Sequence, residues 1–233
     1  PPGPRFDAGI TFQEFGWASA WARTIGTTGG RRLHVATLWQ AGRLIALLPL
    51  VVRRYNGVRM LEWLGAKASD YCDALVLDEG RAEAALGTLW GELRNQGGFD
   101  VARLGQVRTD AHIFKTLSSL GPWTETREQS LGIDIVWPSG DAWLASHTWK
   151  SRQRITRRLR NMRNMGFEFY VLQRGEPHGS VIGAVIAQKT AWLRERGFQN
   201  FLTEPQGPAF LRAAAEELTA SGSLHLSVVG SKE

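Results

Sequence analysis

The residues with the clearest capacity for chemistry form a basic run between positions 150 and 163. Seven side chains in it are cationic and none is acidic: Lys150, Arg152, Arg154, Arg157, Arg158, Arg160 and Arg163. Taking these seven charges from the net charge of +6 leaves −1 for the rest of the chain. Proteins that coat nucleic acid usually spread basic charge over a whole face. The pattern therefore indicates one local site for an anionic partner.

Helical spacing organises this run. An apolar stripe at i, i+4 and i+7 comprises Ile155, Leu159 and Met162, as on one face of an amphipathic helix. The opposite side then carries Lys150, Arg154, Arg157 and Arg160. A solvated helix face is one interpretation. However, solvated helices usually mix charges of both signs, and arginine is suited to bidentate phosphate or carboxylate contacts. We therefore expect the helix to hold an anion.

Other reactive side chains indicate little catalytic chemistry. The five histidines (His34, His112, His147, His178 and His225) show no metal-binding spacing, so we predict no metal site. The single cysteine, Cys72, lies between acidic neighbours that raise a thiol pKa, and we interpret it as structural. One cysteine favours a reducing cytoplasm, and no apolar run approaches the roughly 20 residues of a membrane helix. Tyr71, Asp70 and Asp73 fit a sugar pocket or an Asx-type turn.

The first 137 residues predict a helix followed by a meander and further alternating elements. Thr11 to Glu14 fits a capping box, with Phe15 on the apolar face of the helix that follows. Asn56-Gly57 predicts a hairpin turn. The other expected elements are strands at 33–39, 43–55, 58–64, 74–77, 99–104 and 131–137, and helices at 81–96 and 110–120. This order predicts an α+β fold, with one sheet and helices on it.

Pro138-Ser139-Gly140 is the best candidate for a domain boundary. Beyond it we expect a mostly helical segment at 143–165 that Gly166 ends, strands at 167–172 and 224–229, and helices at 180–196 and 207–220. We predict an N-terminal domain at 1–137 and a basic helix plus half of a second domain at 138–233. A final strand without a partner hairpin is an unusual natural end, so we expect the second domain to be truncated.

The order and spacing of these segments resemble the CelD/BcsL-like acetyltransferases, which belong to the GNAT superfamily and are related to the FemABX peptidyltransferases. The resemblance covers nearly the whole chain and implies tandem GNAT-like domains, the second incomplete. The segments that carry it are Gly16 to Trp21, Leu47 to Leu50, Leu64-Gly65, Asp70 to Asp73, Trp149 to Leu159 and Ala191-Trp192. The implied activity is acyl transfer from acetyl-CoA or another acyl-CoA to a saccharide-like or anionic acceptor, in exopolysaccharide or cellulose production.

The resemblance also implies where substrates bind. In the FemABX relatives the corresponding basic region helps grip a phosphorylated sugar, which makes Lys150, Arg154 and Arg157 candidate substrate-binding residues. Trp192 resembles a position near the acceptor groove, although an ordinary core aromatic is equally compatible, and Tyr71 is a further candidate. The strand-to-helix junction that holds pyrophosphate in GNAT domains is acidic at residues 78–82. Carboxylates there would repel an anion, so we expect that the N-terminal domain does not bind CoA. The corresponding junction of the second domain would lie past residue 233, and we expect the acyl-CoA site there.

Two other functions remain compatible with the sequence. A FemABX-like aminoacyl transfer from charged tRNA to a cell-wall precursor also explains a basic helix, and it predicts steeply salt-dependent tRNA binding. A non-catalytic GNAT-like module that binds nucleic acid or anionic lipid is the third reading, and the modest charge elsewhere argues against it.

Overall fold

The computed structural model describes residues 11–119, 125–173 and 175–230. The chain divides into two compact units. Unit 1 comprises residues 1–122 and 177–224, and unit 2 comprises residues 123–176 and 225–233. Helices α6 and α7 thus group with the N-terminal elements, so the compact units do not follow the boundary expected at 137/138. The division into two GNAT-like domains remains a prediction.

Unit 1 contains two small sheets. One has the order β1-β4-β5-β7 and the other the order β2-β3-β6. All pairs are antiparallel except β5 with β7, which is parallel. The strands are β1 (Arg32–Leu33), β2 (Ala36–Gln40), β3 (Arg43–Leu48), β4 (Leu50–Tyr55), β5 (Val58–Trp63), β6 (Leu75–Val76) and β7 (Val101–Arg103). The predicted mixed α+β architecture is therefore confirmed, but these strands form two small sheets and not the single sheet that the sequence predicted.

Pro49 divides the segment that the sequence predicted as one strand. It lies between β3 and β4, which belong to different sheets. Proline has no backbone N–H to donate to a ladder, although its carbonyl oxygen accepts from the N–H of Leu64 at 2.8 Å. The predicted hairpin is confirmed: Asn56 and Gly57 have φ of 48° and 84°, the left-handed values that a type I′ turn requires.

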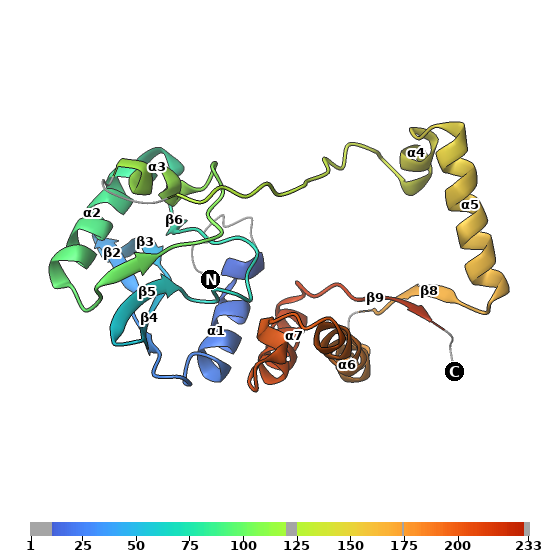
Figure 1. Ribbon diagram of the computed structural model, residues 1–233. Coiled ribbons are helices and arrows are strands. Elements are labelled where there is room, and N and C mark those ends of the chain that lie inside the picture. The colour runs from blue at the N-terminus through green and yellow to red at the C-terminus, as the bar shows by residue number, and fades with distance from the viewer. Residues whose placement is uncertain (1–10, 120–124, 174, 231–233) are drawn as a thin grey trace. The chain divides into compact units, whose positions relative to one another are not determined.

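The helices of unit 1 (Figure 1) are α1 (Phe15–Thr24), α2 (Ala82–Gln96), α3 (His112–Ser119), α6 (Gly179–Glu195) and α7 (Gly207–Ser221), with short 3-10 turns η1 (Thr11–Gln13), η2 (Glu79–Arg81) and η3 (Phe201–Thr203). Helix α2 packs on β2 and β3, whereas α7 packs on α1 and α6 packs on α7. One core joins α2 to the sheets and includes Leu61, Trp63 and Leu86. A second joins α1 to α7 and includes Trp17, Trp21 and Phe210.

Unit 2 contains the basic helix. Its elements are α4 (Gly140–Ala145), α5 (Trp149–Asn164), β8 (Glu168–Val171) and β9 (Ser227–Gly230), and β8 pairs antiparallel with β9. Ser139 caps α4 by accepting the N–H of Ala142 at 3.1 Å. Gly166 follows α5 with a φ of 79°, which confirms the predicted glycine at the end of this helix.

Two further predictions are wrong. Residues 131–137 form no strand, and Leu131, Ile133 and Ile135 are exposed. Their alternation therefore does not correspond to a paired sheet edge among the described residues. The capping box is also wrong, because Thr11 begins a 3-10 turn and α1 starts at Phe15 without a side-chain cap. Phe15 is 83% exposed, and the buried face of α1 consists of Trp17, Ala20 and Trp21 instead.

Candidate functional site

Helix α5 presents its basic residues to solvent. The hydroxyl of Thr148 caps the helix by accepting the N–H of Ser151 at 3.4 Å, and no residue of α5 is buried. All seven basic side chains are exposed. Within the described part of the chain, none of them forms an ion pair with a carboxylate. Their mutual repulsion is therefore not offset by described acidic groups.

The three candidate residues of α5 share one face. At about 100° per residue, Lys150, Arg154 and Arg157 fall within an arc of about 60°. Arg152 and Arg163 fall on the opposite side of the helix by the same geometry. The structure thus brings the three candidates together on a single helix face, where their cationic groups can contact one anion.

Trp192 belongs to a separate cluster on α6. Its ring is 39% exposed and packs against Phe198, with ring centroids 5.7 Å apart. The Nζ atom of Lys189 lies 4.2 Å from the ring centroid, and the guanidinium of Arg196 lies 4.9 Å from it. Trp192 is therefore not an ordinary core aromatic. It forms a half-open aromatic surface flanked by two cations, which suits contact with a flat or anionic group.

Tyr71 lies in another cluster of unit 1. It is half-buried, with the ring of Phe12 6.5 Å away and the guanidinium of Arg108 5.6 Å from its ring centroid. Arg108 is also held by Asp110, with Nε–Oδ1 and Nη2–Oδ2 distances of 2.7 and 2.5 Å. Tyr71 and Trp192 thus lie in different clusters, Tyr71 beside one cation and Trp192 beside two.

The acidic neighbours of Tyr71 have separate roles. Asp70 is exposed, whereas Asp73 is 6% exposed. The Asp73 carboxylate accepts backbone N–H groups from Ala74, His112 and Ile113 at 2.7, 2.8 and 3.0 Å. Both its oxygens are therefore occupied by the protein, which contradicts a sugar-binding role for Asp73. The bonds to the start of α3 also differ from a local Asx-type turn, the other interpretation of the sequence.

Cys72 is the structural thiol that the sequence predicts. Burial, together with the nearby carboxylates of Asp73 and Asp70, raises the pKa of this thiol to about 12. The thiol is therefore protonated at neutral pH and cannot serve as a nucleophile.

Sequence reasoning missed a pocket in unit 1. It lies where the end of α1, strands β4 and β5 and the 3-10 turn η3 meet. Its lining residues are Trp21, Ile25, Arg31, Val51, Arg53, Glu62, Trp63, Ala66, Lys67, Phe201 and Glu204. These positions are far apart in the sequence, so no local motif marks them. The Gly29-Gly30-Arg31 turn after α1 is the one local signal that could have drawn attention to it.

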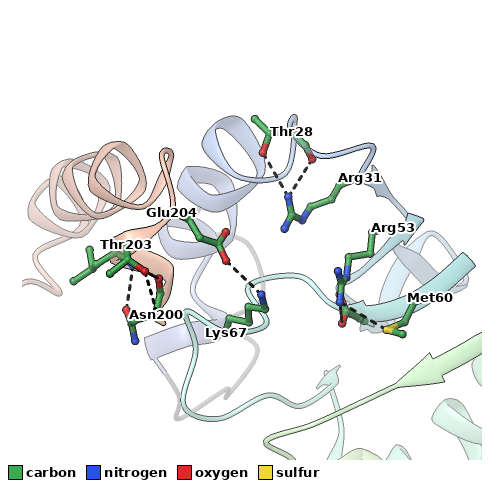
Figure 2. Close-up of polar contacts among 10 residues, drawn as sticks. Thr28, Arg31, Arg53, Met60, Lys67, Asn200, Thr203 and Glu204 are labelled. Atoms are coloured by element: carbon green, nitrogen blue, oxygen red, sulfur yellow. Dashed lines mark hydrogen bonds and ion pairs between the residues drawn. The ribbon is translucent and has the colours of Figure 1, made fainter. Parts of the chain in front are cut away.

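Two ion pairs occupy part of this pocket. Arg53 donates to Glu62 through Nε at 2.5 Å and through Nη2 at 3.1 Å. This hydrogen-bonded contact raises the pKa of Arg53. Lys67 donates to Glu204 at 3.3 Å. Figure 2 labels Arg53, Lys67 and Glu204 together with Arg31, whose Nη1 donates to the carbonyl oxygen of Thr28 at 3.1 Å.

The strand-to-helix junction of unit 1 does not fit a pyrophosphate group. The Asp78 side chain accepts the N–H of Gly80 at 2.9 Å, and it lies 3.7 Å from Arg81. A carboxylate thus already occupies a backbone donor that an anion would need at the helix start. This geometry agrees with the expectation that the junction at residues 78–82 of the N-terminal domain does not hold the pyrophosphate of acyl-CoA.

Two further findings concern the described residues alone. They contain no cluster of three or more His, Cys, Asp or Glu side chains that could hold a metal ion. None of their helices combines the length and apolar character needed to cross a membrane.

Comparison with known proteins addresses the fold and the domain. A solved structure described as the crystal structure of FemX matches 94% of this chain, with a TM-score of 0.54 and 13% sequence identity. This likeness shows a shared fold, and the chain spans about half of the FemX chain, 52%. No curated protein matches significantly. Residues 150–232, which include nearly all of α5, match the family described as the acetyltransferase (GNAT) domain, and this match supports an acyltransferase.

Proposed function

We propose that the chain is part of an acyltransferase that moves an acyl group from acyl-CoA to a hydroxyl or amine of an anionic, saccharide-like acceptor. The observation that carries this proposal is the exposed basic face of α5, formed by Lys150, Arg154 and Arg157. That face lies within the segment that matches the acetyltransferase domain.

Electrostatics favours an anionic ligand on this face. Seven cations lie on one 16-residue helix that contains no acidic residue. Like charges at i, i+4 spacing destabilise a helix by a few tenths of a kcal/mol per pair. A bound phosphate or carboxylate removes that repulsion and forms charge-assisted hydrogen bonds with arginine. We therefore assign acceptor binding to Lys150, Arg154 and Arg157.

The proposed division of labour follows from the chemistry. Acyl-CoA supplies an activated thioester, and transfer requires an acceptor oxygen or nitrogen held close to its carbonyl carbon with a base to remove the proton. We assign only acceptor binding to the described residues. Trp192 and Tyr71 remain proposed substrate contacts, since each combines an accessible or half-buried ring with a nearby cation. A role in exopolysaccharide or cellulose production remains a proposal based on family resemblance.

A paired charge-reversal experiment tests the basic face. The Arg154→Glu/Arg157→Glu variant reverses two charges on the candidate face, and the Arg152→Glu/Arg163→Glu control reverses two on the opposite face. With UDP-glucose as the probe, we expect the first variant to weaken binding at least about tenfold, and the control less than about threefold. Circular dichroism checks the helix content of both variants. Equal losses would show that only total charge matters, and unchanged affinity in the first variant would contradict the proposal.

The resemblance to the FemABX peptidyltransferases implies one alternative, aminoacyl transfer from charged tRNA, and the shared FemX fold is compatible with it. Both functions use a basic helix, but they differ in salt dependence. Each neutralised phosphate contributes to a steep fall in affinity for a nucleic acid as salt rises. Filter binding with bulk tRNA at about 50 and 200 mM salt distinguishes them, since the alternative predicts a loss on the order of 10³-fold. Weak, shallow binding of tRNA beside clear binding of UDP-glucose supports the acyltransferase proposal.

A further inference from the structure

We propose that helix α5 lies on the surface of an anionic lipid bilayer and inserts an apolar stripe into it. The stripe is formed by Ile155, Leu159 and Met162. At about 100° per residue, the centre of the stripe lies about 140° around the helix from the centre of the basic face. This surface is therefore separate from the proposed acceptor site, and its lipid binding does not require acyl transfer.

The apolar stripe remains accessible in the described part of the chain. Leu159 is 47% exposed, and Ile155 and Met162 are half-buried. None of the described helices or strands packs along α5. Because apolar area that stays in water gives up the free energy of burial, the stripe offers a favourable contact to a partner outside the described residues.

The end of α5 adds a fourth apolar residue, Phe167, to this stripe. Gly166 has a φ of 79°, and its N–H donates to the carbonyl oxygen of Arg163 at 2.9 Å. The N–H of Phe167 donates to the carbonyl oxygen of Met162 at 3.0 Å. These two hydrogen bonds form a Schellman motif, which brings the residue after the glycine beside the last turn of the helix. Phe167 is 38% exposed, so an accessible aromatic residue extends the stripe.

Arginine residues border the stripe on both sides. By the same helical geometry, Arg152 and Arg163 lie about 20–40° beyond Leu159, and Arg158 lies about 40° beyond Met162 on the other side. All three arginines are exposed. A helix that lies in a membrane interface has this arrangement, because long basic side chains reach the lipid head groups while the apolar residues enter the boundary of the acyl chains.

The width of the stripe and the charge around it select the partner. A helix that packs on a protein core carries an apolar face at least about 100° wide, whereas this stripe spans about 60°. The seven cations of α5 meet a net charge of only −1 in the rest of the chain, and a second copy of α5 would repel the first. A nucleic acid would pair with the cations but leave the stripe in water. An anionic bilayer pairs with the cations and also covers the stripe.

Vesicle binding by the full 233-residue chain tests the proposal. The anionic vesicles contain equal parts of phosphatidylglycerol and phosphatidylcholine, and the neutral vesicles contain phosphatidylcholine alone. We expect co-sedimentation with the anionic vesicles and at least about tenfold weaker binding to the neutral ones. Leu159→Gln should weaken binding to the anionic vesicles by about fivefold. The matched control, Val185→Gln, replaces a residue of α6 that is 45% exposed, and it should change this binding by less than about twofold.

A charge-reversal variant separates this surface from acceptor binding. Arg152→Glu/Arg163→Glu should weaken binding to the anionic vesicles by at least about tenfold, since each cation near an anionic membrane strengthens binding severalfold. The same variant leaves the basic face intact, so UDP-glucose binding measured without vesicles should persist. Loss of vesicle binding by the wild-type chain with intact UDP-glucose binding contradicts this proposal alone, and the converse contradicts the proposed function alone.

Four results would overturn the proposal. The absence of binding to anionic vesicles assigns the stripe to a protein partner. Equal binding to anionic and neutral vesicles shows that the cations do not contact the bilayer. Equal effects of Leu159→Gln and Val185→Gln show that the stripe does not insert. Binding of bulk tRNA that Leu159→Gln weakens as much as vesicle binding assigns the stripe to a nucleic-acid site. Circular dichroism and melting temperatures of the variants, measured without vesicles, establish that any loss arises in folded protein.

Discussion

The Asp73 carboxylate accepts the backbone N–H of His112 at 2.8 Å, linking two loops that are 39 positions apart in the sequence. The same carboxylate accepts the N–H groups of Ala74 and Ile113. Because the first N–H groups of a helix have no partner within the helix, Asp73 acts as a distant cap for α3. A residue that the sequence placed near a possible sugar pocket therefore stabilises the fold.

Replacement of Asp73 should destabilise unit 1. Asp73→Ala leaves three buried N–H groups without their acceptor, and we expect the free energy of unfolding to fall by about 2–3 kcal/mol. Asp73→Asn keeps one acceptor oxygen and should lose less. Urea unfolding measures both. The exposed neighbour Asp70 provides the control, since Asp70→Ala should change stability by less than about 0.5 kcal/mol. Similar losses at the two positions would refute the capping role.

The elements of this fold were predictable where local signals were strong. Asn56-Gly57 specified its turn, and α2 and α5 followed from helical periodicity with glycine at or just beyond their ends. The error at Pro49 has a physical reason, because only tertiary pairing shows that the strands on its two sides belong to different sheets. The error at 131–137 arose because alternation alone cannot supply a hydrogen-bonding partner.

The candidate functional residues also include some that the sequence predicted and some that it could not. The basic face of α5 was predictable because all its residues lie within one helix. The pocket was not, because Trp21, Arg31, Arg53 and Glu204 come from four separate segments. The role of Asp73 also depends on a contact with α3, which no local pattern encodes.

The Cys72 thiol should resist alkylation in the native protein. Its pKa of about 12 leaves little thiolate at pH 8, and the thiolate is the reactive form. We expect slow reaction with iodoacetamide in buffer and rapid reaction in about 6 M guanidinium chloride, where the pKa returns to about 8.5. The thiol pKa is higher in the folded protein than in the unfolded chain, so ionisation of Cys72 favours unfolding. The stabilising effect of the protonated thiol is therefore complete below about pH 8.5 and is lost as pH rises toward 12. Fast native alkylation at pH 8 would contradict the assignment of a buried thiol.

Asp100 should titrate far below an ordinary carboxyl. Arg59 on β5 donates to it from its guanidinium at 2.6 Å and from its backbone N–H at 2.8 Å. These hydrogen bonds lower the pKa of Asp100 to about 2, and the bond from the Arg59 side chain has the larger effect. Carboxyl carbon shifts in NMR spectra should show this midpoint, and Arg59→Gln should move it toward about 3.9. The stabilising effect is complete above about pH 4 and is lost as pH falls toward 2. A midpoint that Arg59→Gln leaves unchanged would show that another group lowers this pKa.

Repulsion between the cations on the basic face of α5 should lower the stability of this helix, although the same cations provide the proposed binding site. Arg154 has three like-charged neighbours at i−4, i+3 and i+4: Lys150, Arg157 and Arg158. Each such pair destabilises a helix by about 0.2–0.5 kcal/mol. Arg154→Gln should therefore raise the local stability of α5, measured by amide hydrogen exchange, by about 0.5–1.5 kcal/mol. Arg152 has no charged residue at i±3 or i±4, so Arg152→Gln should have little effect on exchange.

If α5 binds an anion, Arg154→Gln should also weaken UDP-glucose binding while it stabilises the helix. Such opposite effects are expected of a residue retained for function at the expense of stability. A purely structural or solvated arginine predicts no loss of binding, and a parallel loss of stability and binding would contradict the assignment of Arg154 to the site.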